Sequence, residues 1–498
     1  MAGVLELYLG IPRRQEGEHA LTAIGVVLGL PLLCASVQRA AAEPLQIDQY
    51  IELILEQGEV PGLSVAIAKN GRVLWERGFG WADVENGVRA TESTPFSVAS
   101  VTKAITATAV MQLQERSELR LDGSVNDYLG SKLHSPMWDA RKATIRQLLS
   151  HTSGLTTFSR WCYPGEPGCE VEKEIRRYGI LVWPPGEVFD YSNLGYGILG
   201  HLIERVSGGT LNSYLRKSLF TPLNMRHCGM KVRKGSAAQY HQKTHRRLEV
   251  KISGHPAASG LFCSAHDLLL FAMFHLKDGL TARSPLRPAA IDETHRAQSN
   301  THGGYGLGWW IKQESDRSVI LAQGGTTGSY ASVMLIPSED LAVVVLANSY
   351  SKSVSELGDQ IVARLLPGFG SGESGRPVEQ GLKDTAASSS LVGNWSGQIT
   401  TVKGPVPASL EISSDGSARG QIGSQPSAPI EGVSIKPRHF YGQLRGDPSI
   451  PGAPADAYTL ELDMALHGND LIGAATTRPP AGDDGNQLPH WIRLSRLP

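Results

Sequence analysis

Residues Ser97–Lys103 read SVASVTK, and the chain continues AITATAVMQLQ to Gln114. This apolar run predicts a helix that lies in the core of a domain. It nevertheless carries a hydroxyl at Ser100 and, three residues later, an ammonium group at Lys103. Residues at this spacing share one face of a helix, about 5–6 Å apart. A serine becomes nucleophilic when a neighbouring base takes its proton, and burial lowers the pKa of a lysine so that its amine can be that base. The stretch therefore predicts a candidate nucleophile and base at the start of a core helix.

The spacing S-x-x-K is weak evidence by itself. About one match is expected by chance in a chain of this size, and Ser349 and Lys352 provide one in a segment without a helix signal. Taken alone, Ser100 and Lys103 are also what an ordinary helix start contains. Other segments have to decide between the two interpretations.

Two loops supply further chemistry. PPGEVFDYSNLGYGILG, residues 184–200, places Tyr191 and Asn193 before an amphipathic helix. The phenol can accept or relay a serine proton and the amide can orient a substrate carbonyl, although Ser192 or Asn193 can equally be a helix N-cap. LAQGGTTGSY, residues 321–330, places Gln323-Gly324-Gly325 just before a predicted strand. Paired glycines let a backbone approach a substrate and offer an oxyanion-binding N–H, or they simply form a turn.

Together these segments resemble the serine β-lactamase and D,D-peptidase superfamily, particularly its class C β-lactamase-like and esterase branch. FSVASVTK (96–103) is similar to the nucleophile segment, and DYSN (190–193) to the Y-x-N element. LLSHTSGL (148–155) and ASGLFCSAHDLLLF (258–271) resemble further characteristic segments. The resemblance runs in the right order from about residue 45 to 365. In LLSHTSGL we expect His151 to hydrogen-bond structurally rather than to titrate in catalysis.

The resemblance implies a serine hydrolase that works through an acyl-enzyme. Ser100, Lys103 and Tyr191 would be catalytic, and the backbone N–H groups of Ser100 and Thr326 would hold the oxyanion. No cofactor or metal is implied. The expected partner is a small-molecule or peptide substrate: a β-lactam, a D-amino acid peptide or a carboxylic ester. The substrate-binding positions implied are Asn193, Gln323, Gly324 and Gly325.

One position departs from the family pattern. The third element usually begins with Lys or His, a cation that helps to hold a substrate carboxylate, whereas this chain has Gln323. Glutamine keeps hydrogen bonding but loses the charge, which shifts the expected substrates toward esters or unusual peptides. The rival interpretation is a penicillin-binding or sensing protein of the same fold that has lost turnover.

The strand signals predict the architecture. LSVAIAKNGRVLWERGFGWAD (63–83) contains two strands around Asn70-Gly71, a strong hairpin signal. YGLGWWIK (305–312), SYASVMLIP (329–337) and LAVVVLANS (341–349) follow a long helical region. We therefore predict an α/β fold, more narrowly α+β. It comprises a β-lactamase/transpeptidase-like antiparallel sheet flanked by helices, a helical subdomain, and a small C-terminal all-β barrel or sandwich.

The predicted domains follow from composition. Residues 1–42 have the layout of a secretory signal peptide, with Arg13-Arg14, an apolar run and a small-residue cleavage site; the alternative is a membrane anchor. The hydrolase domain would span 43–367, a Gly/Ser-rich linker 368–390 and the β domain 391–498. This predicts an exported protein, periplasmic or secreted.

Charge and cysteine content narrow the function further. The chain has 498 residues, 41% hydrophobic and 19% charged, with a formal charge of −1. The balanced charge argues against nucleic acid or an anionic membrane as partner. Cys162 and Cys169 flank YPGEPG and are candidates for a small disulfide in an oxidising compartment. Whether Cys228 and Cys263 are free or bonded is not decided by the sequence.

Overall fold

The structure is a computed structural model of the chain. It describes residues 47–158, 161–162, 170–250, 252–298, 304–370, 390–401, 403–445, 459–478 and 486–498. The predicted signal peptide, Cys169 and most of the predicted linker lie outside these residues.

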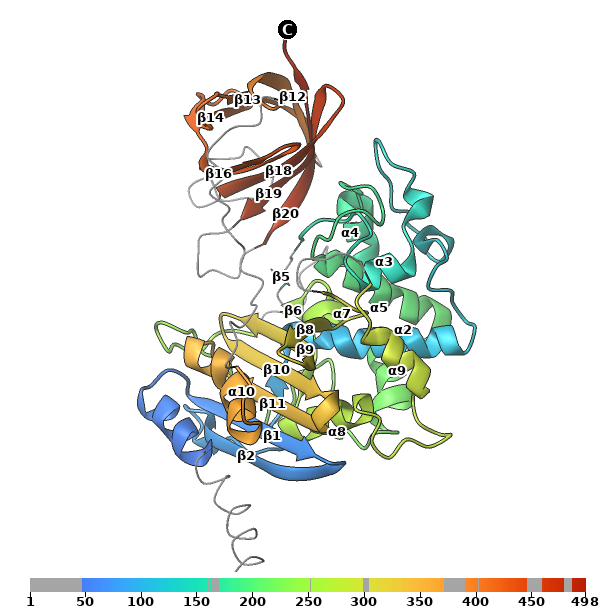
Figure 1. The fold of residues 1–498 in the computed structure, drawn as a ribbon, viewed down its shortest axis with the longest axis vertical. Helices are drawn as coiled ribbons and strands as arrows, with labels where there is room; N and C mark the ends of the chain where they lie inside the picture. The colour runs from blue at the N-terminus through green and yellow to red at the C-terminus, as the bar shows by residue number, and fades with distance from the viewer. Residues whose placement is uncertain are drawn as a thin grey trace, which may run out of the picture. The chain divides into compact units, whose positions relative to one another are not determined.

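An antiparallel seven-stranded sheet forms the centre of the first domain, in the order β3-β2-β1-β11-β10-β9-β8 (Figure 1). Its N-terminal hairpin turns at Asn70 and Gly71, whose φ values of 52° and 68° fit a type I′ turn. Pairing of β1 with β11, for example Val65 opposite Val345, joins this hairpin to the C-terminal strands. The strands are β1 (Gly62–Lys69), β2 (Arg72–Asp83), β3 (Val88–Arg89), β8 (Trp310–Glu314), β9 (Arg317–Thr326), β10 (Ser329–Ile336) and β11 (Leu341–Ala347).

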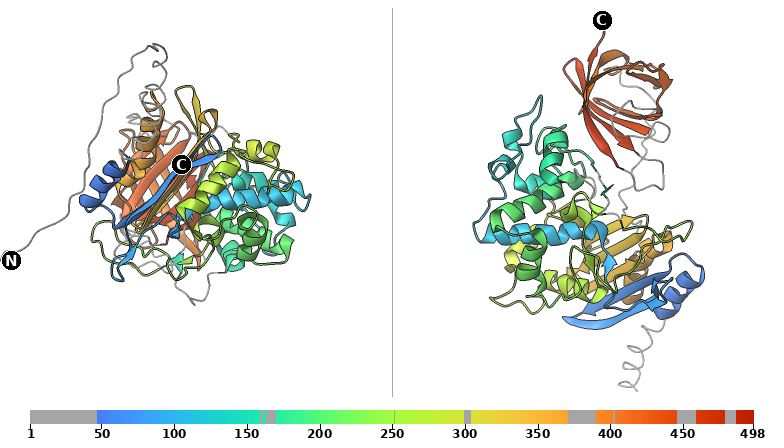
Figure 2. Two further views of the ribbon diagram at one scale, coloured as in Figure 1. Left: turned by 90° about the horizontal axis from the view of Figure 1, so that it is seen from below. Right: turned by 180° about the vertical axis from the view of Figure 1, so that it is seen from behind.

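Helices cover both faces of this sheet (Figure 2). Helix α10 (Lys352–Leu365) packs on β10 and β11 from one side, and α8 (Ala265–His275) packs on β1, β10 and β11 from the other. Strands β10 and β11 are buried along their whole length. Burial on both faces explains why LAVVVLA is a continuous apolar run rather than an alternating one. The predicted sheet with helical layers is confirmed.

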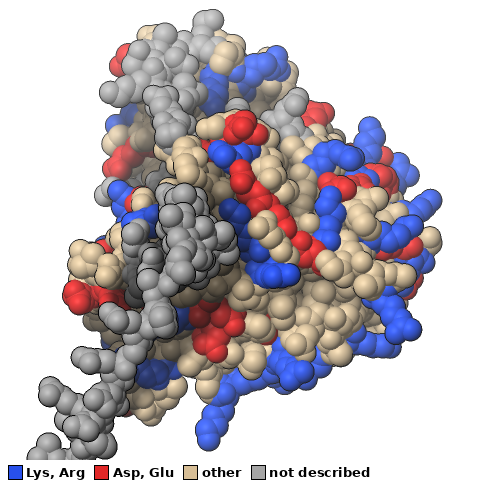
Figure 3. Space-filling model, turned by 60° about the horizontal axis from the view of Figure 1, so that its bottom comes forward, with Lys and Arg blue, Asp and Glu red and all other residues tan. Residues whose placement is uncertain are grey.

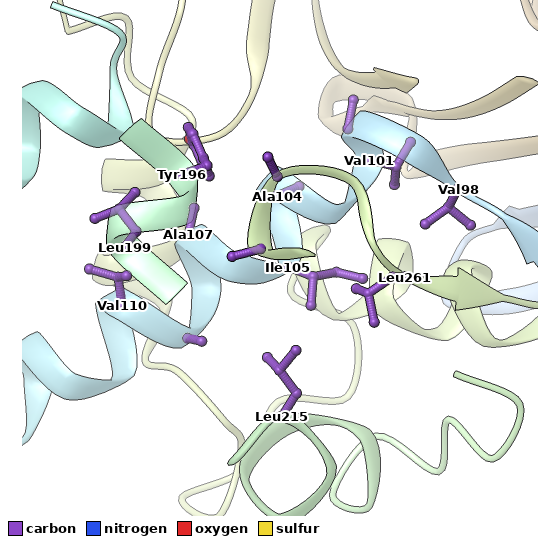
Figure 4. Packing of buried hydrophobic residues seen from close by; sticks show 14 of the residues in the cluster. Val98, Val101, Ala104, Ile105, Ala107, Val110, Tyr196, Leu199, Leu215 and Leu261 are labelled. Atoms are coloured by element: carbon purple, nitrogen blue, oxygen red, sulfur yellow. The ribbon is translucent and has the colours of Figure 1, made fainter. Parts of the chain in front are cut away.

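A helix at residues 47–56 precedes β1 and packs beside α10, and the other described helices lie between β2 and β8 and form the helical part of the domain. Apolar side chains of α2, α5 and the segment before β7 form one buried cluster there; Figure 4 shows Leu199 beside Val110, and Leu261 beside Ile105. Helices and short strands of this part are α2 (Thr102–Glu115), α3 (Ile145–Leu149), α4 (Val171–Tyr178), α5 (Asn193–Ser207), α6 (Leu211–Leu215), α7 (Pro256–Ser259), α9 (Pro288–Thr294), β4 (Phe96–Ser97), β5 (Trp161–Cys162), β6 (Ile252–Ser253) and β7 (Phe262–Cys263).

The C-terminal domain is a nearly closed barrel made from one antiparallel nine-stranded sheet, in the order β15-β14-β13-β12-β20-β19-β18-β17-β16. Leu460, Leu462, Met464 and Leu466 alternate into its core, as the sequence pattern predicts. The strands are β12 (Gly393–Thr401), β13 (Gly404–Ile412), β14 (Ala418–Ile422), β15 (Ala428–Pro429), β16 (Glu431–Lys436), β17 (His439–Arg445), β18 (Thr459–His467), β19 (Asp470–Arg478) and β20 (Leu488–Arg496).

Charges of both signs are interspersed on the face of the molecule seen in Figure 3. This distribution agrees with the balanced composition and gives no single-signed surface there. Within the described ranges, no helix has the length and apolar character that crossing a membrane requires.

Candidate active site

Ser100 lies in a tight turn that precedes α2. Strand β4 leads into a 3-10 turn, Ala99–Val101, and the α-helix begins only at Thr102. Ala99 has a positive φ of 42°, a conformation that costs a non-glycine residue energy and is concentrated at functional sites. The Thr102 hydroxyl donates a 2.6 Å hydrogen bond to the Ala99 carbonyl and fixes the turn. The serine is therefore presented at the N-terminus of a buried helix, where the positive end of the dipole favours an oxyanion.

Lys103 is buried directly beside Ser100. Its side chain is 1% exposed, and Nζ lies 3.0 Å from Ser100 Oγ. Nζ also donates to Asn193 Oδ1 at 2.7 Å and to the Ala258 carbonyl at 3.1 Å. These partners are uncharged, and burial lowers the pKa of Lys103 well below its usual value. A neutral amine at hydrogen-bond distance from a serine hydroxyl can take its proton.

Tyr191 and Asn193 reach the same point from the start of α5. Ser192 is the N-cap, because its Oγ accepts from the Gly195 N–H, and Asn193 is the first helical residue. Lys103 Nζ lies 4.6 Å from the centroid of the Tyr191 ring. Burial raises the pKa of Tyr191 above its usual range, and a hydrogen bond with the Ser100 side chain opposes this only in part. Tyr191 therefore keeps its proton, which suits a relay better than a base.

His151 holds the backbone on both sides of Tyr191. Its carbonyl accepts from Asp190 N at 2.8 Å, and its Nδ1 accepts from Ser192 N at 3.1 Å. Its ring lies 4.2 Å from the ring of Tyr191, centroid to centroid. Burial, with the nearby Lys103, lowers the pKa of His151 well below its usual value, so the ring stays neutral. Its contacts are structural, as the sequence indicated.

Gln323, Gly324 and Gly325 lie just before strand β10, as the sequence predicted, and they themselves form the last part of β9 rather than a turn. A Cβ on Gly324 would lie 2.4 Å from the backbone nitrogen of Ser100, so only glycine lets β9 approach the nucleophile turn. Gln323 Nε2 donates to the Tyr330 hydroxyl at 3.2 Å. Thr326 ends β9, and its backbone role at the oxyanion stays a prediction.

A cleft of about 930 Å³ opens at these residues. Sequence reasoning missed several of its polar groups, among them Lys312 on β8 and Tyr330 on β10. Alternation along β8 places Lys312 on the same side as Trp310, and this period-2 pattern was the signal that could have found it. The lining includes Ser100, Tyr191, Trp310, Lys312, Gln323, Gly324, Gly325, Tyr330 and Tyr350.

The second S-x-x-K match does not form such a pair. Ser349 is fully buried, whereas the Lys352 side chain is 82% exposed and lies 3.9 Å from Glu356. The expectation that this segment lacks a helix was wrong, because α10 begins at Lys352 with Ser351 as its N-cap. Position in the fold, rather than spacing, distinguishes the two matches.

The family follows from comparison with known proteins. A model of the beta-lactamase family matches residues 47–366. The chain belongs to the beta-lactamase family. Protein flp of Staphylococcus aureus (strain N315) is 28% identical over 339 residues, which cover 64% of this chain and 66% of flp, just under two thirds of its length.

Solved structures share the fold. A class C beta lactamase from Rhodobacter sphaeroides has a TM-score of 0.56 at 23% identity and covers 64% of this chain and 99% of its own. The crystal structure of SurE with D-Leu has a TM-score of 0.62 at 23% identity, covering 92% of this chain and 100% of its own. The predicted class C-like fold is thereby confirmed.

The structure also settles one pair of cysteines. Cys228 and Cys263, which the sequence left open, form a disulfide. The predicted pairing of Cys162 with Cys169 falls outside the described residues. No cluster of three or more metal-ligating side chains occurs in the part of the chain that the structure describes.

Proposed function

We propose that the protein is a serine hydrolase that forms an acyl-enzyme at Ser100 on a carboxylic ester or amide. The observation that carries this proposal is the 3.0 Å contact between Ser100 Oγ and Lys103 Nζ. Nζ is buried among uncharged groups, which lowers the pKa of the lysine. Membership of the beta-lactamase family supports it.

In the proposed acylation, Ser100 Oγ attacks the carbonyl carbon while its proton passes to neutral Lys103 Nζ. The tetrahedral oxyanion forms beside the Ser100 N–H at the start of α2. The proton then passes through the Tyr191 hydroxyl to the leaving oxygen or nitrogen as the scissile bond breaks. Water, activated by the same amine, adds to the ester carbonyl and releases the acid and free Ser100. Every proton removed is returned within one turnover.

Three substrate classes compete: β-lactams, D-amino acid peptides and carboxylic esters. Gln323 contacts Tyr330 and brings no charge to the cleft, which disfavours substrates that depend on a carboxylate at this point. We therefore place neutral esters and peptides first. The structure of SurE was determined with D-Leu, and the shared fold makes D-amino acid derivatives sensible members of a substrate panel.

The test is labelling with a fluorophosphonate and a fluorescent penicillin, followed by turnover of esters and D-Ala peptides. The fluorophosphonate should label the wild-type protein, the penicillin should label it more slowly, and Ser100→Ala should abolish both labelling and turnover. Lys103→Met, which keeps the side-chain volume, should remove acylation while the protein stays folded. Retained turnover in Ser100→Ala would exclude this assignment.

A binding or sensing protein without turnover is the second candidate. The observation that favours it is the uncharged Gln323 at the position where the family pattern has Lys or His. Such a protein would give one rapid acylation burst with a stable adduct. A hydrolase would give the burst followed by steady product release.

We also propose export to an oxidising compartment. The buried Cys228–Cys263 disulfide supports this, because disulfides persist in such compartments. Fractionation of cells expressing the full chain, with thiol alkylation before lysis, tests it.

A further inference from the structure

The carbonyl that contacts Lys103 belongs to α7, a short helix between the two helices that carry the site. Ala258 O accepts from Lys103 Nζ at 3.1 Å, and Ala257 O accepts from Thr106 Oγ1 at 2.8 Å. On the α5 side, a Cβ on Gly200 would lie 2.4 Å from Ala257 Cβ. Helix α7 therefore packs tightly between α2 and α5 and closes the pocket around the amine.

The chain after α7 is bound to the nucleophile turn. Leu261 N donates to Thr102 Oγ1 at 3.3 Å, and Leu261 O accepts from Val98 N at 3.0 Å. Figure 4 shows the Leu261 side chain near Val98 and Ile105 in the same packed region. A displacement of this segment would move the backbone on both sides of Ser100.

The segment is held at its far end by the disulfide. Strand β7 pairs with β4, with Cys263 opposite Phe96. Phe262 exchanges two 2.9 Å backbone hydrogen bonds with Gly229, and the neighbouring Cys228 is bonded to Cys263. Cys263 is 0% and Cys228 3% exposed. The pairing of β7 with β4, the hydrogen bonds to Gly229 and the disulfide thus fix the chain that follows α7. This matters because α7 has only four residues and can form few hydrogen bonds of its own.

We propose that the Cys228–Cys263 disulfide is a positioning element for Lys103: it holds α7 over the amine and thereby keeps the base dry and aimed at Ser100. The proposal rests on the proposed function and goes beyond it. Without the disulfide, water reaches Nζ through the loosened α7, and the amine is protonated over more of the working pH range. Acylation then needs a higher pH, because each unit by which the pKa of the base rises removes a factor of ten from its neutral fraction at lower pH.

The test compares the full-length Cys228→Ala/Cys263→Ala variant with the wild-type protein. The rate of fluorophosphonate labelling is measured from pH 5.5 to 9, and amide hydrogen exchange is followed at Val98 and Leu261. We expect the midpoint of the labelling profile to rise by about one pH unit, labelling at pH 6 to fall about tenfold, and both amides to exchange faster.

Two further variants keep the proposal falsifiable if the cysteine variant folds poorly. Thr106→Val loses the hydrogen bond to Ala257 O but keeps the disulfide and the side-chain shape, so it should shift the profile in the same direction. Thr106→Ser keeps the donor and should not. Ile51→Ala, in the helix at residues 47–56 that packs with α10 and away from α7, controls for general destabilisation.

A folded cysteine variant with the wild-type profile and wild-type exchange would overturn the proposal. An equal shift in Ile51→Ala would overturn it too, since the disulfide would then act only through global stability. If the wild-type protein is not labelled at any pH, the proposed function has failed. Exchange at Leu261 still decides whether the disulfide fixes α7, because that measurement requires no turnover.

Discussion

His151→Phe tests how precisely Tyr191 has to be held. The change keeps an aromatic ring in contact with the Tyr191 ring, at the place where the rings are now 4.2 Å apart. It removes Nδ1, the acceptor for the Ser192 N–H, which is buried. The perturbation thus separates ring packing from the hydrogen bond that fixes the residue after Tyr191.

The magnitude follows from that one lost acceptor. A buried donor left without a partner costs about 1–3 kcal/mol of the free energy of unfolding. If the loop instead moves to satisfy the donor, Tyr191 moves with it, and a displacement of about 1 Å costs up to about 100-fold in rate. We expect a 10- to 100-fold slower acylation. His151→Asn should recover part of it, because asparagine brings an acceptor and tolerates the positive φ of 59° at this position.

The assay pairs single-turnover labelling of the full chain with urea unfolding. If His151→Phe lowers the free energy of unfolding by about 1–3 kcal/mol but labels within twofold of the wild-type rate, the histidine is structural only and the positioning argument is refuted. Equal rates for His151→Phe and His151→Asn would also refute it.

Three further outcomes are expected. Gln323→His should raise kcat/KM for a carboxylate-bearing β-lactam about 10-fold or more relative to a neutral ester; an unchanged ratio would disprove the argument about the missing cation. Burial lowers the pKa of His295 to about 3 and that of its partner His275 well below normal. The stability that these neutral histidines contribute is therefore fully present above their pKa in the unfolded chain, near 6.5, and is lost as the pH falls below that value. The free energy of unfolding measured in urea should fall by about 2 kcal/mol between pH 7 and 5 through His295 alone, and His295→Gln should flatten that slope. Lys352→Ala should label like the wild-type protein, and slower labelling would show that the exposed S-x-x-K match contributes.

Local signals explain why parts of the fold were predictable from the sequence. Asn70-Gly71 fixes its own turn, because both residues tolerate positive φ. Ser192 caps α5 and Gly208, in a left-handed conformation, ends it, so that helix could be placed from its ends. In each case the deciding interaction is made within a few residues.

The rest depends on contacts between distant segments. The pair of glycines before Thr326 looks like a turn, but β9 continues through it because Gly324 has to lie against Ser100. Pairing among cysteines cannot be deduced from spacing, and the Cys228–Cys263 bond joins residues 35 apart. Helix α10 was missed although Val354, Leu357 and Ile361 have helical spacing, because its polar start resembles a loop.

The most direct test of the central claim is intact-mass analysis after incubation with a panel of esters, β-lactams and D-Ala peptides, followed by peptide mapping. We predict one added acyl group on the wild-type protein, located on the peptide that contains Ser100, and none on Ser100→Ala. An adduct that persists in Ser100→Ala, or that maps to another residue, would contradict the assignment of Ser100 as the nucleophile.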